Sequence, residues 1–179
     1  MTVLIDYNNK SKKTSNNLVL FVGENFNISG IKKYLSNLEY SYISDLLKNS
    51  DLKKDLLYFE INSRKKIFLV PIKKDLKISE IENLGAKFHK YLDYDSKNDY
   101  LINSDSITSK NENFLGYFLH GLKLKSYKFN IYKTKKNKKT ISIGVFGNKK
   151  KFSLKNNLRF KALEEGTFYT RDLVSEPGN

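Results

Sequence analysis

The sequence of 179 residues contains no cysteine, which excludes a disulfide framework, a thiolate metal site and a cysteine nucleophile. It has no run of about 18 apolar residues, so it predicts no transmembrane helix and no membrane partner. Its first 13 residues lack an apolar core behind a basic start, so no secretory signal is predicted. Together these absences favour a cytoplasmic protein.

Acidic residues are missing from one long segment, residues 113–163. That segment holds fourteen of the 33 Lys and Arg residues, while the rest of the chain balances 19 basic against 19 acidic residues. The whole net charge of +14 therefore belongs to one region. Such a region can bind phosphate backbones, but charge runs are more often solvated faces, and a lysine- and asparagine-rich coding bias would give the same pattern.

Apolar residues make up 39% of the chain, which is enough for a folded core. Six short apolar runs predict strands, and several of them are continuous, as is typical of central strands buried on both faces of a sheet. They cover residues 3–7, 18–22, 56–61, 67–72, 99–103 and 141–146. Residues 127–132 are a candidate for a seventh strand.

Helical patterns lie between and after these strands. Two short amphipathic segments cover residues 31–38 and 42–48. A longer helix, whose start resembles a capping box of Ser79 and Glu82, carries an apolar face of Ile78, Ile81, Gly85, Phe88 and Leu92. Two further stripes at helical spacing are formed by Phe114, Leu115, Phe118, Leu119 and Leu122 and, within residues 155–174, by Leu158, Ala162, Tyr169 and Leu173.

Strands interspersed with helices predict an α/β fold. We expect a mixed sheet of about six, mostly central strands that is flanked by helices, followed by one long C-terminal helix. Catalytic motifs are missing from this pattern: there is no Gly-x-Ser-x-Gly elbow, no glycine-rich phosphate loop and no spacing of carboxylates for a two-metal site. His89 and His120 lie on apolar helical faces, so both are interpreted as partly buried structural residues.

Two segments stand out by the order of their residues. In the first, a helix end at Gly121 leads to Ser126-Tyr-Lys-Phe129 and then to Tyr132-Lys-Thr-Lys-Lys136. The second, over residues 170–179, contains Arg171, Asp172, Leu173, Pro177 and Asn179. Both resemble segments of leucyl (cytosol) aminopeptidases, in which the motif Arg-Asp-Leu-Val-Asn-x-Pro-x-Asn closes a long interdomain helix. Ser175 stands where that family usually has the first Asn of this motif.

This resemblance implies a macrodomain-like N-terminal α/β domain over residues 1–152 and a connecting helix with the start of a catalytic domain over residues 153–179. In the family, the catalytic domain holds two divalent metal ions, Mn or Zn, and releases N-terminal amino acids from peptides. None of the family's catalytic or metal-binding motifs occurs in this sequence, so the resemblance assigns no catalytic residue here. It implies a non-catalytic portion of a metalloprotease that is inactive alone and forms a homo-hexamer when full length.

Two other hypotheses stay open. The basic segment predicts a nucleic-acid-binding α/β module, with DNA contacts from a lysine cluster. That cluster comprises Lys133, Lys135, Lys136, Lys138 and Lys139. The third hypothesis is a macrodomain-like pocket for a nucleotide derivative such as ADP-ribose. Under the aminopeptidase hypothesis the C-terminal helix joins two domains. We then expect it to leave Phe160, Leu163 or Leu173 exposed.

Overall fold

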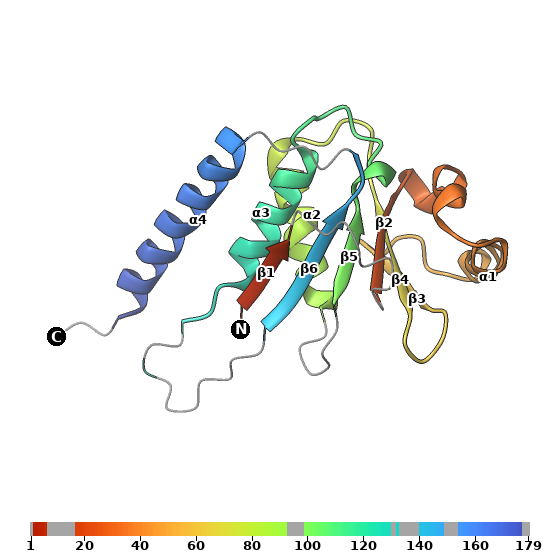
Figure 1. The fold of residues 1–179 in the computed structure, drawn as a ribbon, viewed down its shortest axis with the longest axis horizontal. Helices are drawn as coiled ribbons and strands as arrows, with labels where there is room; N and C mark the ends of the chain where they lie inside the picture. The colour runs from red at the N-terminus through yellow and green to blue at the C-terminus, as the bar shows by residue number, and fades with distance from the viewer. Residues whose placement is uncertain are drawn as a thin grey trace.

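The computed structural model of the protein describes residues 2–6, 17–92, 99–129, 132, 140–148 and 154–176. Its centre is a six-stranded sheet in the order β1-β6-β5-β2-β4-β3 (Figure 1). The strands are β1 (Thr2–Asp6), β2 (Asn17–Val22), β3 (Leu57–Glu60), β4 (Lys66–Pro71), β5 (Tyr100–Asn103) and β6 (Thr140–Phe146). The six predicted strands are confirmed, each to within one residue at either end.

All neighbouring strands run parallel except β3, which pairs antiparallel with β4. The central strand β2 pairs with both β4 and β5, and its residues from Val19 to Val22 are almost fully buried. Val19 and Phe21 belong to one core cluster, whereas Leu20 and Val22 belong to another. Side chains of a strand alternate between the two faces of a sheet, so both faces are covered and the continuous apolar run is explained.

One face is covered by α2 (Ile78–Phe88) and α3 (Phe114–Ser126). These helices touch backbone to backbone, because a Cβ atom on Gly85 would lie 1.9 Å from the Phe118 carbonyl oxygen. A Cβ atom on Gly121 would lie equally close, at 1.9 Å, to the Glu82 carbonyl oxygen. The predicted α3 stripe is confirmed as core, since its five residues are at most 2% exposed.

The opposite face is covered by α1 (Asn37–Lys48) together with the 3-10 turns η1 (Glu24–Phe26) and η2 (Ser29–Tyr34). The predicted helix over residues 31–38 is wrong, because η2 ends at Tyr34 and α1 begins only at Asn37. A capping box fixes that start: the Glu39 amide donates to Ser36 Oγ at 3.2 Å, and the Ser36 amide donates to Glu39 Oε2 at 2.9 Å.

Two local predictions near the other helices are also wrong. The N-cap residue of α2 is Lys77, two residues before the expected Ser79. The Glu80 carboxylate accepts from the Lys77 amide at 2.8 Å. The proposed seventh strand fails in its described part, because Tyr127, Lys128 and Phe129 follow α3 without strand structure. Residues 130–131 lie outside the described part of the chain.

The last helix, α4 (Leu154–Ser175), lies outside the two layers and packs on α3, so that α3 stands between it and the sheet (Figure 1). Its 22 residues span about 33 Å at 1.5 Å per residue. The 3-10 turns η3 (His89–Tyr91) and η4 (Ser104–Ser106) complete the elements of the described residues. None of the helices that the described residues form could span a membrane.

The predicted apolar stripe of α4 exists, but it faces away from the protein. Leu158 is 60% exposed, Tyr169 66% and Leu173 53%. The face turned toward α3 carries Phe160, Glu164 and Phe168 instead. Of the three residues expected to remain free on a connecting helix, Leu163 and Leu173 are exposed, whereas Phe160 packs edge-on against the ring of Tyr117 at 5.3 Å.

Candidate functional site

The two segments that carry the family resemblance meet in space at the junction of α3 and α4. Tyr127, from the first segment, follows directly after α3, and its hydroxyl donates a 2.6 Å hydrogen bond to Asp172 Oδ1 on α4. Arg171 Nη1 donates to the Leu124 carbonyl oxygen at 2.7 Å. The Arg171 guanidinium also lies 5.4 Å from the centre of the Tyr127 ring, within cation–π range.

Aromatic stacking completes this junction. Phe168, one turn before Asp172, stacks on Tyr127 with 5.3 Å between ring centres. Partial burial, together with the hydrogen bond to Asp172, raises the pKa of Tyr127 above its ordinary value. The phenol therefore keeps its proton at neutral pH and remains the donor to Asp172. Leu173 points away from the junction, and Pro177 and Asn179 lie outside the described residues.

A second polar contact, about two turns earlier on α4, was missed in the sequence. Glu164 is 7% exposed, and its Oε2 accepts from Lys123 Nζ at 2.9 Å. Its Oε1 lies 3.3 Å from Nδ1 of His120, which is also buried. The sequence did contain a signal for this contact. Glu164 stands midway between Phe160 and Phe168 at four-residue spacing, so the three residues share a helical face other than that of the apolar stripe.

The histidines take the structural places expected of them. His120 lies buried between α3 and α4, against Glu164 and within 5.3 Å of the Phe160 ring centre. His89, at the end of α2, is partly buried, and burial with the nearby Lys128 and Lys125 lowers its pKa below the ordinary value. Within the described residues, no three His, Asp or Glu side chains are grouped so as to hold a metal ion. The described residues therefore do not fit a two-metal catalytic centre.

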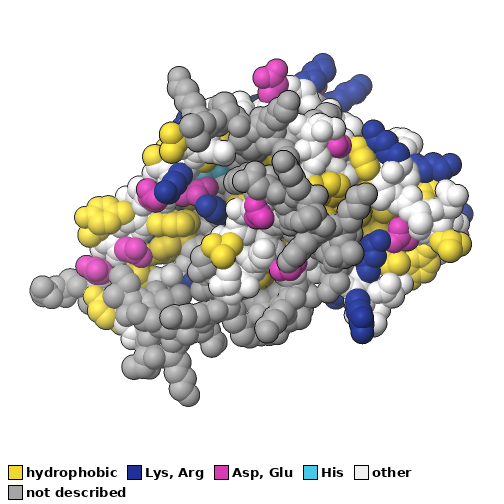
Figure 2. Space-filling model, in the orientation of Figure 1, with side chains coloured by type: hydrophobic (Ala, Val, Ile, Leu, Met, Phe, Trp, Pro, Cys, Tyr) yellow, Lys and Arg dark blue, Asp and Glu magenta, His cyan; other side chains and the backbone are white. Residues whose placement is uncertain are grey.

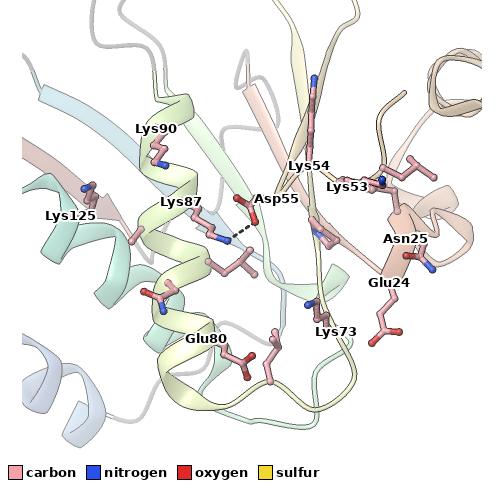
Figure 3. A pocket seen from close by; sticks show the side chains of 17 residues that line it. Glu24, Asn25, Lys53, Lys54, Asp55, Lys73, Glu80, Lys87, Lys90 and Lys125 are labelled. Carbon is pink, nitrogen blue, oxygen red and sulfur yellow. Dashed lines mark hydrogen bonds and ion pairs between the residues drawn. The ribbon is translucent and has the colours of Figure 1, made fainter. Parts of the chain in front are cut away.

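A hollow of about 660 Å³ lies between α2, the turn η1 and the loop before β3 (Figure 3). Lysines dominate its rim: Lys53, Lys54, Lys73, Lys87, Lys90 and Lys125. Its carboxylates are engaged with neighbours, since Asp55 pairs with Lys87 and Glu24 accepts from the Lys74 amide at 2.8 Å. The hollow attracts anions by charge, but no glycine is among its described lining residues, so it offers no phosphate-binding loop.

The lysines predicted to contact nucleic acid lie in a different place along the chain. Lys133, Lys135, Lys136, Lys138 and Lys139 all fall outside the described residues. Their contribution to a binding surface stays a prediction.

Comparison with known proteins gives a consistent fold and little sequence identity. No protein-family model matches the chain, and no curated protein sequence matches it. A tomato leucine aminopeptidase point mutant aligns with a TM-score of 0.62 at 13% identity, covering 99% of this chain and 38% of that one. The cytosol aminopeptidase of Coxiella burnetii aligns at 0.61 and 11% identity, covering 98% of this chain and 33% of that one.

A third solved structure, the bottromycin maturation enzyme BotP in complex with Mn, aligns with a TM-score of 0.58 at 9% identity and covers 91% of this chain. The chain spans between 32% and 38% of the length of these three proteins. The likeness includes α4, because alignments that cover 98% and 99% of the chain cannot omit a helix of 22 residues. The chain thus has the fold of the N-terminal region of leucine and cytosol aminopeptidases, which confirms the sequence resemblance at the level of fold.

Proposed function

We propose that this chain is the N-terminal, non-catalytic portion of a leucyl aminopeptidase, a two-metal enzyme that releases N-terminal amino acids from peptides. The observation that carries the proposal is the agreement between fold and motif. The fold likeness extends over 99% of the chain, and the two segments that resemble the family contact each other through Tyr127 and Asp172.

In this proposal the N-terminal domain ends near residue 152, and α4 connects it to the catalytic domain. A connector must hold the following domain at a fixed angle, and polar contacts with strict geometry do this better than apolar packing alone. Such contacts lie at two levels of α4, where Glu164 meets Lys123 and where Arg171 and Asp172 meet the end of α3. Arg171, Asp172 and Leu173, with Pro177 and Asn179 beyond the described residues, are then linker residues and not catalytic ones.

The metal ions, Mn or Zn, belong in this proposal to a catalytic domain outside this chain. The Mn complex of BotP supports metal dependence among proteins of this fold. The described residues form no metal site. In this proposal they contribute no ligand to the metals, and we expect the chain to be inactive alone. The full-length enzyme would act on peptides in the cytoplasm as a homo-hexamer.

The test is to identify the protein that contains this chain in its native cell. An antibody raised against the 179-residue chain would isolate the product, whose mass and hydrolysis of leucine p-nitroanilide are then measured before and after chelation. We expect a product of about three times the chain's mass, as the 33–38% coverage implies, whose activity is lost on chelation and restored by Mn or Zn. A product of the chain's own mass, with no associated aminopeptidase activity, would overturn the proposal.

A further inference from the structure

The exposed stripe of α4 is continuous along one side of the helix. Leu158, Ala162, Gly166, Tyr169 and Leu173 recur at intervals of three and four residues and are all exposed. This spacing places them on one helical face about 22 Å long. Figure 2 shows hydrophobic side chains gathered on the α4 side of the molecule. Exposed apolar stripes of this length mark an interaction surface.

Four of the five stripe residues are placed symmetrically about a point between Glu165 and Gly166. Leu158 and Leu173 are equally far from that point, and so are the small Ala162 and the large Tyr169. If a second, identical helix lay antiparallel across this point, each Leu158 would meet a Leu173 and each Tyr169 ring would lie over an Ala162. The stripe is therefore complementary to itself in one orientation, as a twofold interface requires.

Gly166 marks the crossing point. A glycine inside a helix costs about 1 kcal/mol relative to alanine, so its presence calls for a reason. Crowding within the chain is not the reason, because a Cβ atom on Gly166 would meet nothing within 4 Å. A glycine at the centre of a helix pair lets the two backbones approach closely. That is the role Gly85 and Gly121 already have between α2 and α3.

The charges of α4 favour the same orientation. Among the exposed charges of α4, Arg159 and Lys161 lie in its first half and Glu165 in its second, and Glu176 follows directly after the helix. Glu164 and Asp172 are engaged with α3 and with Tyr127. Arg171 also lies in the second half, but it is engaged with the Leu124 carbonyl oxygen of α3. The helix has no acidic residue in its first turn and no basic residue in its last, so its charges do not follow the helix dipole. An antiparallel partner would bring acidic residues of one helix near the N-terminus of the other.

We propose that the α4 stripe binds the α4 stripe of a second copy of this chain, antiparallel and across Gly166, in a twofold-symmetric dimer. The inference rests on the exposed stripe of α4 and not on enzymatic activity, so failure of the activity assay would leave it standing. The other occupant of the stripe would be the following domain of the proposed aminopeptidase, and a 179-residue chain that stays monomeric would favour it.

Sedimentation equilibrium of the 179-residue chain gives the first test. We expect a concentration-dependent dimer. Leu173→Glu should raise its dissociation constant by at least about tenfold, because symmetry places two unpaired carboxylates in the interface. The matched control is Leu38→Glu on α1, an exposed leucine at 84%, which should leave the dissociation constant unchanged.

Cysteine cross-linking tests the orientation, and the natural chain offers no competing thiol. On mild oxidation, Gly166→Cys should form a disulfide-linked dimer with itself. Leu158→Cys alone and Leu173→Cys alone should not, because identical positions would lie about 22 Å apart, far beyond the reach of a disulfide at about 4.4–6.8 Å between Cα atoms. An equimolar mixture of these two variants should form the disulfide.

Three results would overturn the proposal. The first is a chain that stays monomeric at about 200 μM, well above the micromolar dissociation constants of weak specific complexes. The second is a dimer that Leu173→Glu does not weaken. The third is self-cross-linking of Leu158→Cys, which would mean a parallel pair.

Discussion

The helices α3 and α4 lie side by side but are held in different ways. Nine of the thirteen residues of α3 are buried, whereas Glu164 is the one buried residue among the described side chains of α4. The helix α3 is apolar on nearly every side because it fills the space between α2, the sheet and α4. The helix α4 is attached along one face by stacked rings and a few charged groups, and it leaves its apolar stripe free.

This difference teaches that an apolar stripe identifies a helix more reliably than it identifies the face turned toward the core. In α3 the stripe and the buried face coincide. In α4 they are on opposite sides, and the buried face is marked by aromatic residues around one glutamate. Changing matched residues on the two helices should therefore give different, and in one case opposite, effects on stability.

The largest difference is expected from truncating an apolar side chain on each helix. Phe118 on α3 is fully buried, and its ring lies edge-on to Phe21 at 5.2 Å. Phe118→Ala should lower the free energy of unfolding in urea by about 3–5 kcal/mol, because it removes apolar contact and leaves a cavity. Leu158→Ala on α4 should change it by less than about 0.5 kcal/mol, measured at a concentration where the chain is monomeric. Equal losses from the two variants would contradict the contrast.

Glycine to alanine changes on the two helices should differ in sign. In Gly121→Ala the new Cβ atom would lie 1.9 Å from the Glu82 carbonyl oxygen, so α2 and α3 must move apart, at a cost of about 1–3 kcal/mol. In Gly166→Ala the new methyl group meets nothing within 4 Å, and the monomer should gain up to about 1 kcal/mol from helix propensity. Urea unfolding at low concentration measures both, and a stabilised Gly121→Ala variant would disprove the close contact of α2 and α3.

The polar attachment of α4 can be broken at Glu164. Glu164→Ala leaves His120 buried without its carboxylate neighbour, while the partly exposed Lys123 can turn to water. We expect a loss of about 2 kcal/mol, together with faster hydrogen exchange along α4 than in α3. The neighbouring Glu165→Ala removes an exposed pair with Lys161 and should cost less than about 0.5 kcal/mol. If both variants exchange like the wild type, Glu164 does not hold α4 in place.

Much of the fold could be predicted because each local signal agreed with its tertiary environment. The six strands were found because their apolar runs end in polar residues and both faces of the sheet are covered. The capping box at Ser79 was misplaced because α2 is capped from Lys77 by Glu80, and the Ser79–Glu82 pattern overlaps this pair within six residues. The real Ser36–Glu39 box starts α1 near the end of the segment 31–38, which was predicted as one helix.

The site was predicted less completely, for a physical reason. Arg171 and Asp172 were found by resemblance, but their partners Leu124 and Tyr127 are more than forty residues away, and sequence spacing does not encode that contact. The direction of the α4 stripe could not be read from periodicity either. Both faces of that helix carry large apolar residues, and α3 selects the one with Phe160 and Phe168.

The smallest effect concerns His89, where α2 meets the basic end of α3. Its pKa lies below the ordinary value of 6.5 because of burial and the charges of Lys128 and Lys125. The unfolded chain therefore binds the proton more readily than the folded one, so His89 contributes stability above pH 6.5 that is lost as the pH falls through its lowered pKa. His89→Gln should reduce the loss of unfolding free energy between about pH 7.5 and 5.5.

Lys125→Gln should move the pKa of His89, followed by NMR titration, back toward 6.5. Lys161→Gln removes the same charge from α4 and should leave that pKa where it is, so an equal shift in both variants would mean that net charge, and not the end of α3, acts on His89.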